Sequence, residues 1–98
     1  MNEYLITVEL PADLSEEFIA LIPAHRHRVN ELMQEGIITS YSLAADRRRL
    51  WTTLIASGEE DVVKTLMTLP LYRFMQFEVR ELMFHNIPVF AAPRFSVN

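Results

Sequence analysis

The strongest constraint on the fold of this chain is the order in which strand-like and helix-like patterns follow one another. Four segments alternate apolar with polar residues or are rich in β-branched and aromatic side chains, and both features are typical of strands. The second and third are separated by only a few residues near 46–48, which predicts a hairpin. The four predicted strands are residues 3–10, 37–45, 49–56 and 74–84.

The segment from about residue 14 to 35 has helical spacing, because its apolar side chains recur every three or four residues on one stripe. Asp13 and Glu16 have the spacing of a capping box at its start, and Gly36 suits a C-cap at its end. Pro23 deletes one backbone hydrogen bond inside this segment. We therefore expect either one bent helix or two helical pieces that meet near residue 22.

A second helix follows the hairpin. Ser57 and Glu60 predict a capping box at its start, and Pro70 predicts its end. The resulting order, β-α-β-β-α-β, is that of the ferredoxin-like α+β fold, with a four-stranded antiparallel sheet and both helices on one face. The other face also carries apolar residues and needs a cover. A second copy of the chain would supply one, giving a dimeric α+β barrel.

Composition narrows the class of protein. Ninety-eight residues make one domain, which we place at 1–86, followed by an extended tail at 87–98. Two interpretations of the tail stay open, packing on a neighbouring subunit and a flexible end. The absence of cysteine excludes disulfides and thiolate metal sites. No secretory signal or membrane-length apolar run is present, so we expect a cytoplasmic protein without a membrane partner. A net charge of −4 argues against nucleic acid, whereas the local arginine clusters suit a small anion.

Three segments carry a family resemblance: VELPADL near the start, LMQEG at the end of the first helix, and TLMTLPLYRFMQFEV before and within the last strand. The stretch Thr65–Met75 is the most specific of these. The chain resembles the muconolactone isomerases of aromatic catabolism over roughly residues 3–88. The resemblance implies a homodimer at least, with a decamer as the larger assembly. It also implies an intramolecular isomerase that transposes a C=C bond in a small carboxylated lactone, without metal, flavin or nucleotide.

This reaction needs a base for a carbon-bound proton, a group that stabilises an enolate-like charge, and a cation for the carboxylate. We predict His25 and Glu78 as catalytic residues, with Arg80 as the carboxylate anchor. Tyr41 and Trp51 would shape the substrate pocket. Each of these roles has a structural alternative that stays open. For His25 it is a core histidine, and for Glu78 and Arg80 it is an ion pair or polar residues at the dimer interface. For Tyr41 and Trp51 it is packing as aromatic core residues.

No metal site is predicted, because His25 and His27 lie about 200° apart around a regular helix. Arg47–Arg49 are interpreted as a solvated hairpin tip, with recruitment to a neighbouring subunit as the alternative. Two other functions remain open beside the isomerase. One is a non-catalytic oligomeric module that binds a small molecule, and the other is a cofactor-independent monooxygenase of the same fold.

Overall fold

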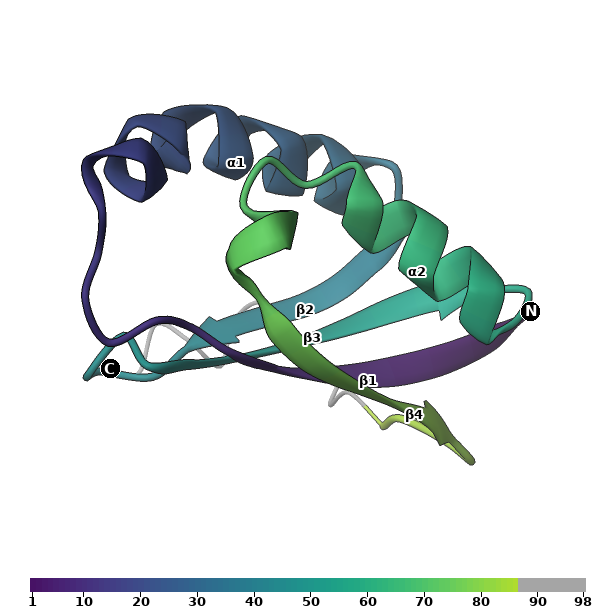
Figure 1. The fold of residues 1–98 in the computed structure, drawn as a ribbon. Coiled ribbons are helices and arrows are strands. Elements are labelled where there is room, and N and C mark those ends of the chain that lie inside the picture. The colour runs from purple at the N-terminus through teal and green to yellow at the C-terminus, as the bar shows by residue number, and fades with distance from the viewer. Residues whose placement is uncertain (87–98) are drawn as a thin grey trace, which may run out of the picture.

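The fold is a four-stranded antiparallel sheet with two helices packed on one face (Figure 1). The structure is a computed structural model and describes residues 1–86. The predicted tail at 87–98 lies outside these residues. Along the sheet the strands follow the order β2-β3-β1-β4, as the ferredoxin-like prediction requires. The elements are β1 (Asn2–Glu9), α1 (Glu16–Gln34), β2 (Ile38–Leu43), β3 (Arg49–Ala56), α2 (Glu59–Met67), a 3₁₀ turn η1 (Tyr72–Phe74) and β4 (Gln76–Leu82).

The register of β1 separates the two faces of the sheet. Tyr4, Ile6 and Val8 are buried under the helices, as their alternation predicts. Leu5 and Thr7 point to the other face, where they pair with outward residues of β3 and β4. The core therefore lies between the sheet and the helices. Its largest fully buried side chains are Ile6, Val8, Leu32, Leu54, Val62 and Leu66.

Helix α1 begins two residues later than the predicted capping box, which placed the N-cap at Asp13. Ser15 is the N-cap, and its hydroxyl accepts a hydrogen bond from the Phe18 amide at 3.1 Å. The predicted pairing of Asp13 with Glu16 is therefore wrong. Glu16 and Glu17 occupy the first turn, where carboxylates interact favourably with the helix dipole.

Pro23 does not divide α1, which is continuous through it. The missing proline amide would have bonded to the Ile19 carbonyl, and Ile19 lies on the exposed side of the helix, where water can satisfy that oxygen. At the other end, Gly36 has φ +77° and donates to the Met33 carbonyl, while Ile37 donates to the Leu32 carbonyl. This is a Schellman motif, as Gly36 predicts.

The predicted boundaries at the second helix and last strand shift slightly. Gly58 is the N-cap of α2 and has no side-chain hydrogen bond, while Ser57 pairs with Asp61 instead of Glu60. The last strand begins at Gln76 rather than at residue 74, because the 3₁₀ turn takes up the preceding residues.

Candidate functional site

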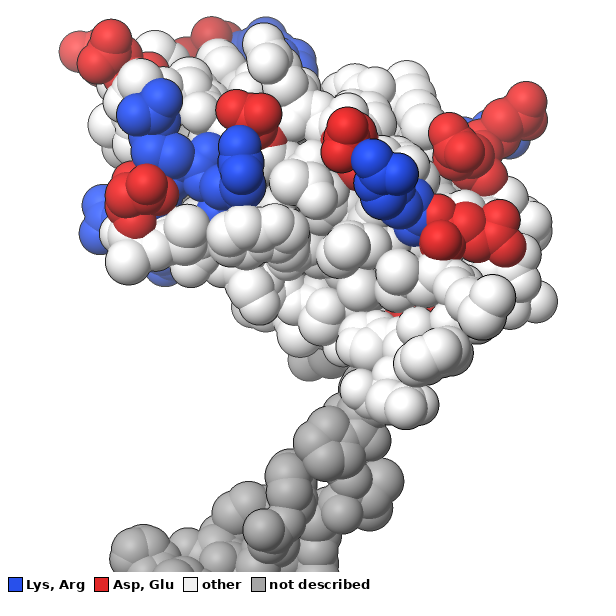
Figure 2. All heavy atoms as spheres, turned by 90° about the horizontal axis from the view of Figure 1, so that it is seen from below, with Lys and Arg blue, Asp and Glu red and all other residues white. Residues whose placement is uncertain are grey.

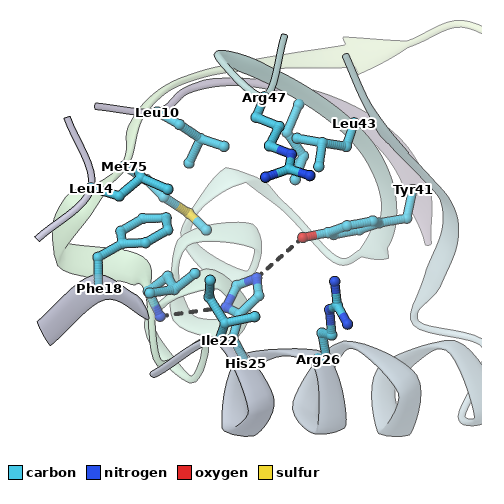
Figure 3. A pocket seen from close by; sticks show the side chains of 12 residues that line it. Leu10, Leu14, Phe18, Ile22, His25, Arg26, Tyr41, Leu43, Arg47 and Met75 are labelled. Carbon is cyan, nitrogen blue, oxygen red and sulfur yellow. Dashed lines mark hydrogen bonds between the residues drawn. The ribbon is translucent and has the colours of Figure 1, made fainter. Parts of the chain in front are cut away.

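A pocket of about 370 Å³ opens between α1, the hairpin of β2 and β3, and the segment after α2. This volume is within the range that holds a small organic ligand. Most of its wall is apolar, and four of its side chains are polar: His25, Arg26, Tyr41 and Arg47. Figure 3 shows these four projecting toward the same space from α1, β2 and the hairpin tip. The apolar wall consists of Leu10, Leu14, Phe18, Ile22, Leu43, Leu50, Leu71 and Met75.

His25 is held by hydrogen bonds at both ring nitrogens (Figure 3). The Leu71 amide donates to Nδ1 at 3.4 Å, and Nε2 lies 3.1 Å from the Tyr41 hydroxyl. Because Nδ1 accepts, the neutral ring carries its hydrogen on Nε2 and donates it to Tyr41. The hydrogen bond from the Leu71 amide is long, so it only weakly disfavours the tautomer that carries its hydrogen on Nδ1.

Burial governs the ionisation of this pair. Desolvation lowers the pKa of His25 below its ordinary 6.5, so the ring is neutral at physiological pH. Desolvation also raises the pKa of Tyr41 to about 12, so its hydroxyl keeps its hydrogen. With His25 donating to the Tyr41 oxygen, the tyrosine hydrogen is available to an acceptor in the pocket.

Arg26 and Arg47 are charged lining residues that the sequence analysis did not assign to the site. They are 21 positions apart in the chain, and the fold brings both to the pocket. Neither guanidinium forms an ion pair or a side-chain hydrogen bond with another of residues 1–86, whereas Arg28, Arg49 and Arg73 each lie beside a carboxylate. The concentration of arginines in two short clusters was the available signal, because it indicated a small anion.

The other predicted site residues lie elsewhere. Glu78 and Arg80 occupy β4 on the sheet face turned away from the helices, with 69% and 72% of their side chains exposed, and their charged atoms are 3.9 Å apart. Trp51 of β3 points to this same open face, opposite Thr7. The structure therefore joins His25 with Tyr41, but the sheet separates both from Glu78, Arg80 and Trp51. Any role of these three in substrate binding stays a prediction.

A chain of hydroxyl groups crosses the open face. Ser40 lies 2.6 Å from Thr53, Thr53 lies 2.6 Å from Thr39, and Thr39 donates to Glu3 at 2.5 Å. His85, which follows β4, places its Nδ1 3.2 Å from the same carboxylate. The hydroxyl contacts satisfy polar groups on a surface that is otherwise mostly uncharged near the middle strands, whereas His85 Nδ1 is buried without a hydrogen bond despite its proximity to Glu3. Figure 2 views this face and shows charged side chains gathered beside a broad uncharged area.

Comparison with known proteins identifies the family. The family model described as muconolactone delta-isomerase matches residues 3–87. The chain belongs to the muconolactone delta-isomerase family. The resemblance carried by residues 65–75 is thereby confirmed. The membership supports an isomerase-like function.

Solved structures agree on the fold. A crystal structure of muconolactone isomerase matches with a TM-score of 0.70 and 22% sequence identity, covering 91% of this chain and 96% of that one. At this identity the likeness bears on the fold alone. No curated protein sequence matches the chain.

Two further findings concern metals and membranes. Among residues 1–86, no group of three or more His, Cys, Asp or Glu side chains is placed to hold a metal ion. None of the described helices combines the length and apolar character needed to cross a bilayer.

Proposed function

We propose that this chain is a cofactor-independent isomerase that shifts a proton, and with it a C=C bond, in a small carboxylated lactone or related cyclic acid. The observation that carries the proposal is the hydrogen-bonded pair of His25 and Tyr41 within the apolar pocket of a muconolactone-isomerase fold. The pocket supplies the two groups that such a reaction needs near the reacting carbon atoms.

His25 is proposed as the proton acceptor. It is neutral at physiological pH, and of the polar groups lining the pocket it alone can take up a proton there, because guanidinium groups are always protonated. Proton uptake at Nε2 requires the tautomer with the hydrogen on Nδ1, together with rotation of the Tyr41 hydroxyl away from Nε2. The Nε2 lone pair then faces the ligand carbon, and the single tyrosine hydrogen can point to the ligand oxygen. The cost is small, since the Leu71 hydrogen bond that favours the resting tautomer is 3.4 Å long.

Tyr41 is proposed to stabilise the negative charge that forms when the proton leaves. Its hydroxyl remains protonated, since its pKa is about 12, and it faces the pocket. Donation to the oxygen of an enolate is worth most in a site of low polarity, such as this one with its leucine and phenylalanine walls. After the double bond has moved, His25 returns the proton to another carbon, so that no atom is gained or lost.

We also propose that the working form is a homodimer at least, joined through the open face of the sheet. The middle of this face carries uncharged residues of β1 and β3, namely Leu5, Thr7, Trp51, Thr53 and Ile55. Figure 2 shows a broad uncharged area on the same face. A larger ring such as a decamer would assemble from these dimers. We also propose that the segment 87–98 contacts a neighbouring subunit in this assembly.

The test is turnover and deuterium exchange with muconolactone in heavy water, followed by proton NMR on the purified protein. We expect double-bond migration with deuterium incorporation, and both should fall at least a hundredfold in His25→Gln, which retains an amide donor near Tyr41. His27→Gln is the matched control, because His27 lies on the same helix with its side chain exposed. Glu78→Gln tests the catalytic role predicted for Glu78.

Three outcomes would count against this proposal, the first against its assigned residues and the other two against the reaction itself. Full turnover in both His25→Gln and Glu78→Gln would remove the assigned residues. No exchange in a folded parent protein would favour a non-catalytic binding module, while oxygen consumption with a quinol-like compound would favour a monooxygenase.

A further inference from the structure

Two positively charged side chains line the candidate pocket without a negative partner inside it. Arg26 comes from α1 and Arg47 from the tip of the hairpin, and the lining includes no aspartate or glutamate. His25 is neutral, so the pocket carries two positive charges at physiological pH. Both arginines are exposed residues at the edge of the pocket. An anion lying between them against the apolar wall is attracted by two positive charges at once.

The backbone at Arg47 gives an independent indication. Among the non-glycine residues described, Arg47 alone has positive φ, at 64°. The left-handed conformation is unfavourable for a residue with a long side chain, and glycine or asparagine would be the usual choice in a turn. A large residue in this conformation occurs in turns and at functional sites that retain local strain, and here the strained residue is also one that lines the pocket.

The turn around Arg47 is firmly held. The Arg47 amide donates to the Ala44 carbonyl at 2.9 Å, and the Arg48 amide donates to Asp46 Oδ1 at 2.9 Å. Leu10 donates to the Arg48 carbonyl at 2.9 Å, which ties the tip to the chain leaving β1. These bonds fix the direction in which the Arg47 side chain leaves the backbone. Figure 3 shows that it projects into the pocket toward the region of the Tyr41 hydroxyl.

We propose that Arg26 and Arg47 together bind the carboxylate of the pocket's ligand and are the residues that select an anionic ring over its neutral analogue. This deepens the proposed function and rests on the same pocket. The ring lies against the apolar wall formed by residues such as Phe18 and Leu43, and its carbonyl oxygen faces Tyr41. In this proposal Arg26 and Arg47 replace Arg80, which the sequence predicted as the carboxylate anchor.

The test compares acids with their neutral analogues by isothermal titration calorimetry. The probes are muconolactone and its methyl ester, and benzoate and benzyl alcohol. We expect each acid to bind the parent protein at least tenfold more tightly than its neutral analogue. This preference should be lost in Arg47→Gly and in Arg26→Gln. It should persist in Arg48→Gln, the neighbouring arginine that does not line the pocket.

Arg47→Gly also separates function from folding. Glycine adopts φ 64° without strain, so the melting temperature should be unchanged or higher while acid binding weakens. Loss of acid binding together with a lower melting temperature in Arg47→Gly would be checked with Arg47→Gln, which keeps the original strain. The proposal is overturned if neither acid binds the parent protein, if acid and neutral analogue bind alike, or if both Arg47 variants retain the preference.

These outcomes differ from those that test the isomerase. Selective acid binding without turnover would leave the arginine pair in place and remove the isomerase. Turnover with an unchanged KM in Arg47→Gly and Arg26→Gln would support the isomerase and remove the role of the arginine pair.

Discussion

His25 Nε2 lies 3.1 Å from the Tyr41 hydroxyl oxygen, so that one hydrogen bond links α1 to β2 across the candidate pocket. The two residues are 16 positions apart, and neither is fully exposed. His25 Nε2 and the Tyr41 hydroxyl therefore depend on each other for a hydrogen bond. Removing either one leaves a polar atom in a largely apolar environment, which costs stability as well as any chemistry.

Tyr41→Phe should lower turnover by about a hundredfold, since it deletes the single donor proposed for the enolate oxygen. It should lower the free energy of unfolding by only about 1 kcal/mol, as for loss of one partly buried hydrogen bond. Steady-state kinetics and urea unfolding measure the two effects. Tyr72→Phe is the matched control, because Tyr72 packs against Phe77 and lies outside the pocket lining. Equal losses in both variants would contradict the role of Tyr41.

Stability should depend on pH through His25. Burial lowers the pKa of His25 in the folded chain, so below its ordinary value of 6.5 the unfolded chain takes up a proton that the folded chain resists. The free energy of unfolding should therefore be fully maintained above about pH 7 and decrease as the pH falls below about 6.5. Urea unfolding at several pH values measures this slope. His25→Gln should flatten it and His27→Gln should not; a parent slope that survives in His25→Gln would assign it to other groups.

Periodicity accounts for most of the agreement between sequence and fold. Tyr4, Ile6 and Val8 predict the buried face of β1 because side chains alternate strictly along a strand, and Gly36 predicts the end of α1 because few other residues adopt its φ. Local details were less certain. Ser15 and Asp13 are both good caps, and only the approach of the chain from β1 to α1 decides between them.

The candidate site was harder to predict because it depends on which face of the sheet each residue occupies. Glu78 and Arg80 alternate with the core-facing Phe77 and Val79, and this alternation alone places them opposite the helical stripe of His25. Arg47 shows the opposite difficulty. Its side chain reaches the pocket through a left-handed backbone conformation that no sequence pattern here indicated.

The two glycines should respond differently to alanine. Gly36 has φ +77°, so Gly36→Ala should cost about 1 to 2 kcal/mol although no atom lies within 4 Å of the added methyl group. Gly58 has extended backbone at φ 177° and equally open surroundings, so Gly58→Ala should cost only about 0.5 kcal/mol, which reflects the poorer N-cap preference of alanine. Urea unfolding of both variants measures the difference. Similar costs at both positions would mean that the left-handed conformation of Gly36 is not what limits substitution there.

The open face of the sheet should control oligomeric state. Trp51 lies in the middle of this face and is 37% exposed in a single chain, so a second copy would bury a large aromatic surface there. Trp51→Glu should place a charge in that contact and shift the protein to monomers in light scattering coupled to size-exclusion chromatography. Met67→Glu is the matched control, because Met67 is an exposed apolar residue at the end of α2, on the helical side of the sheet.

The same pair of variants distinguishes assembly from folding. Circular dichroism should show a folded chain in both, because neither side chain belongs to the buried core. A Trp51→Glu protein that remains an oligomer of the parent's size would mean that the open face is not the principal contact. Conversion to monomers by Met67→Glu would instead place the contact on the helical side. Since the pocket lies between the sheet and the helices, ligand binding by a monomeric Trp51→Glu would further indicate that one chain forms the binding site without its partner.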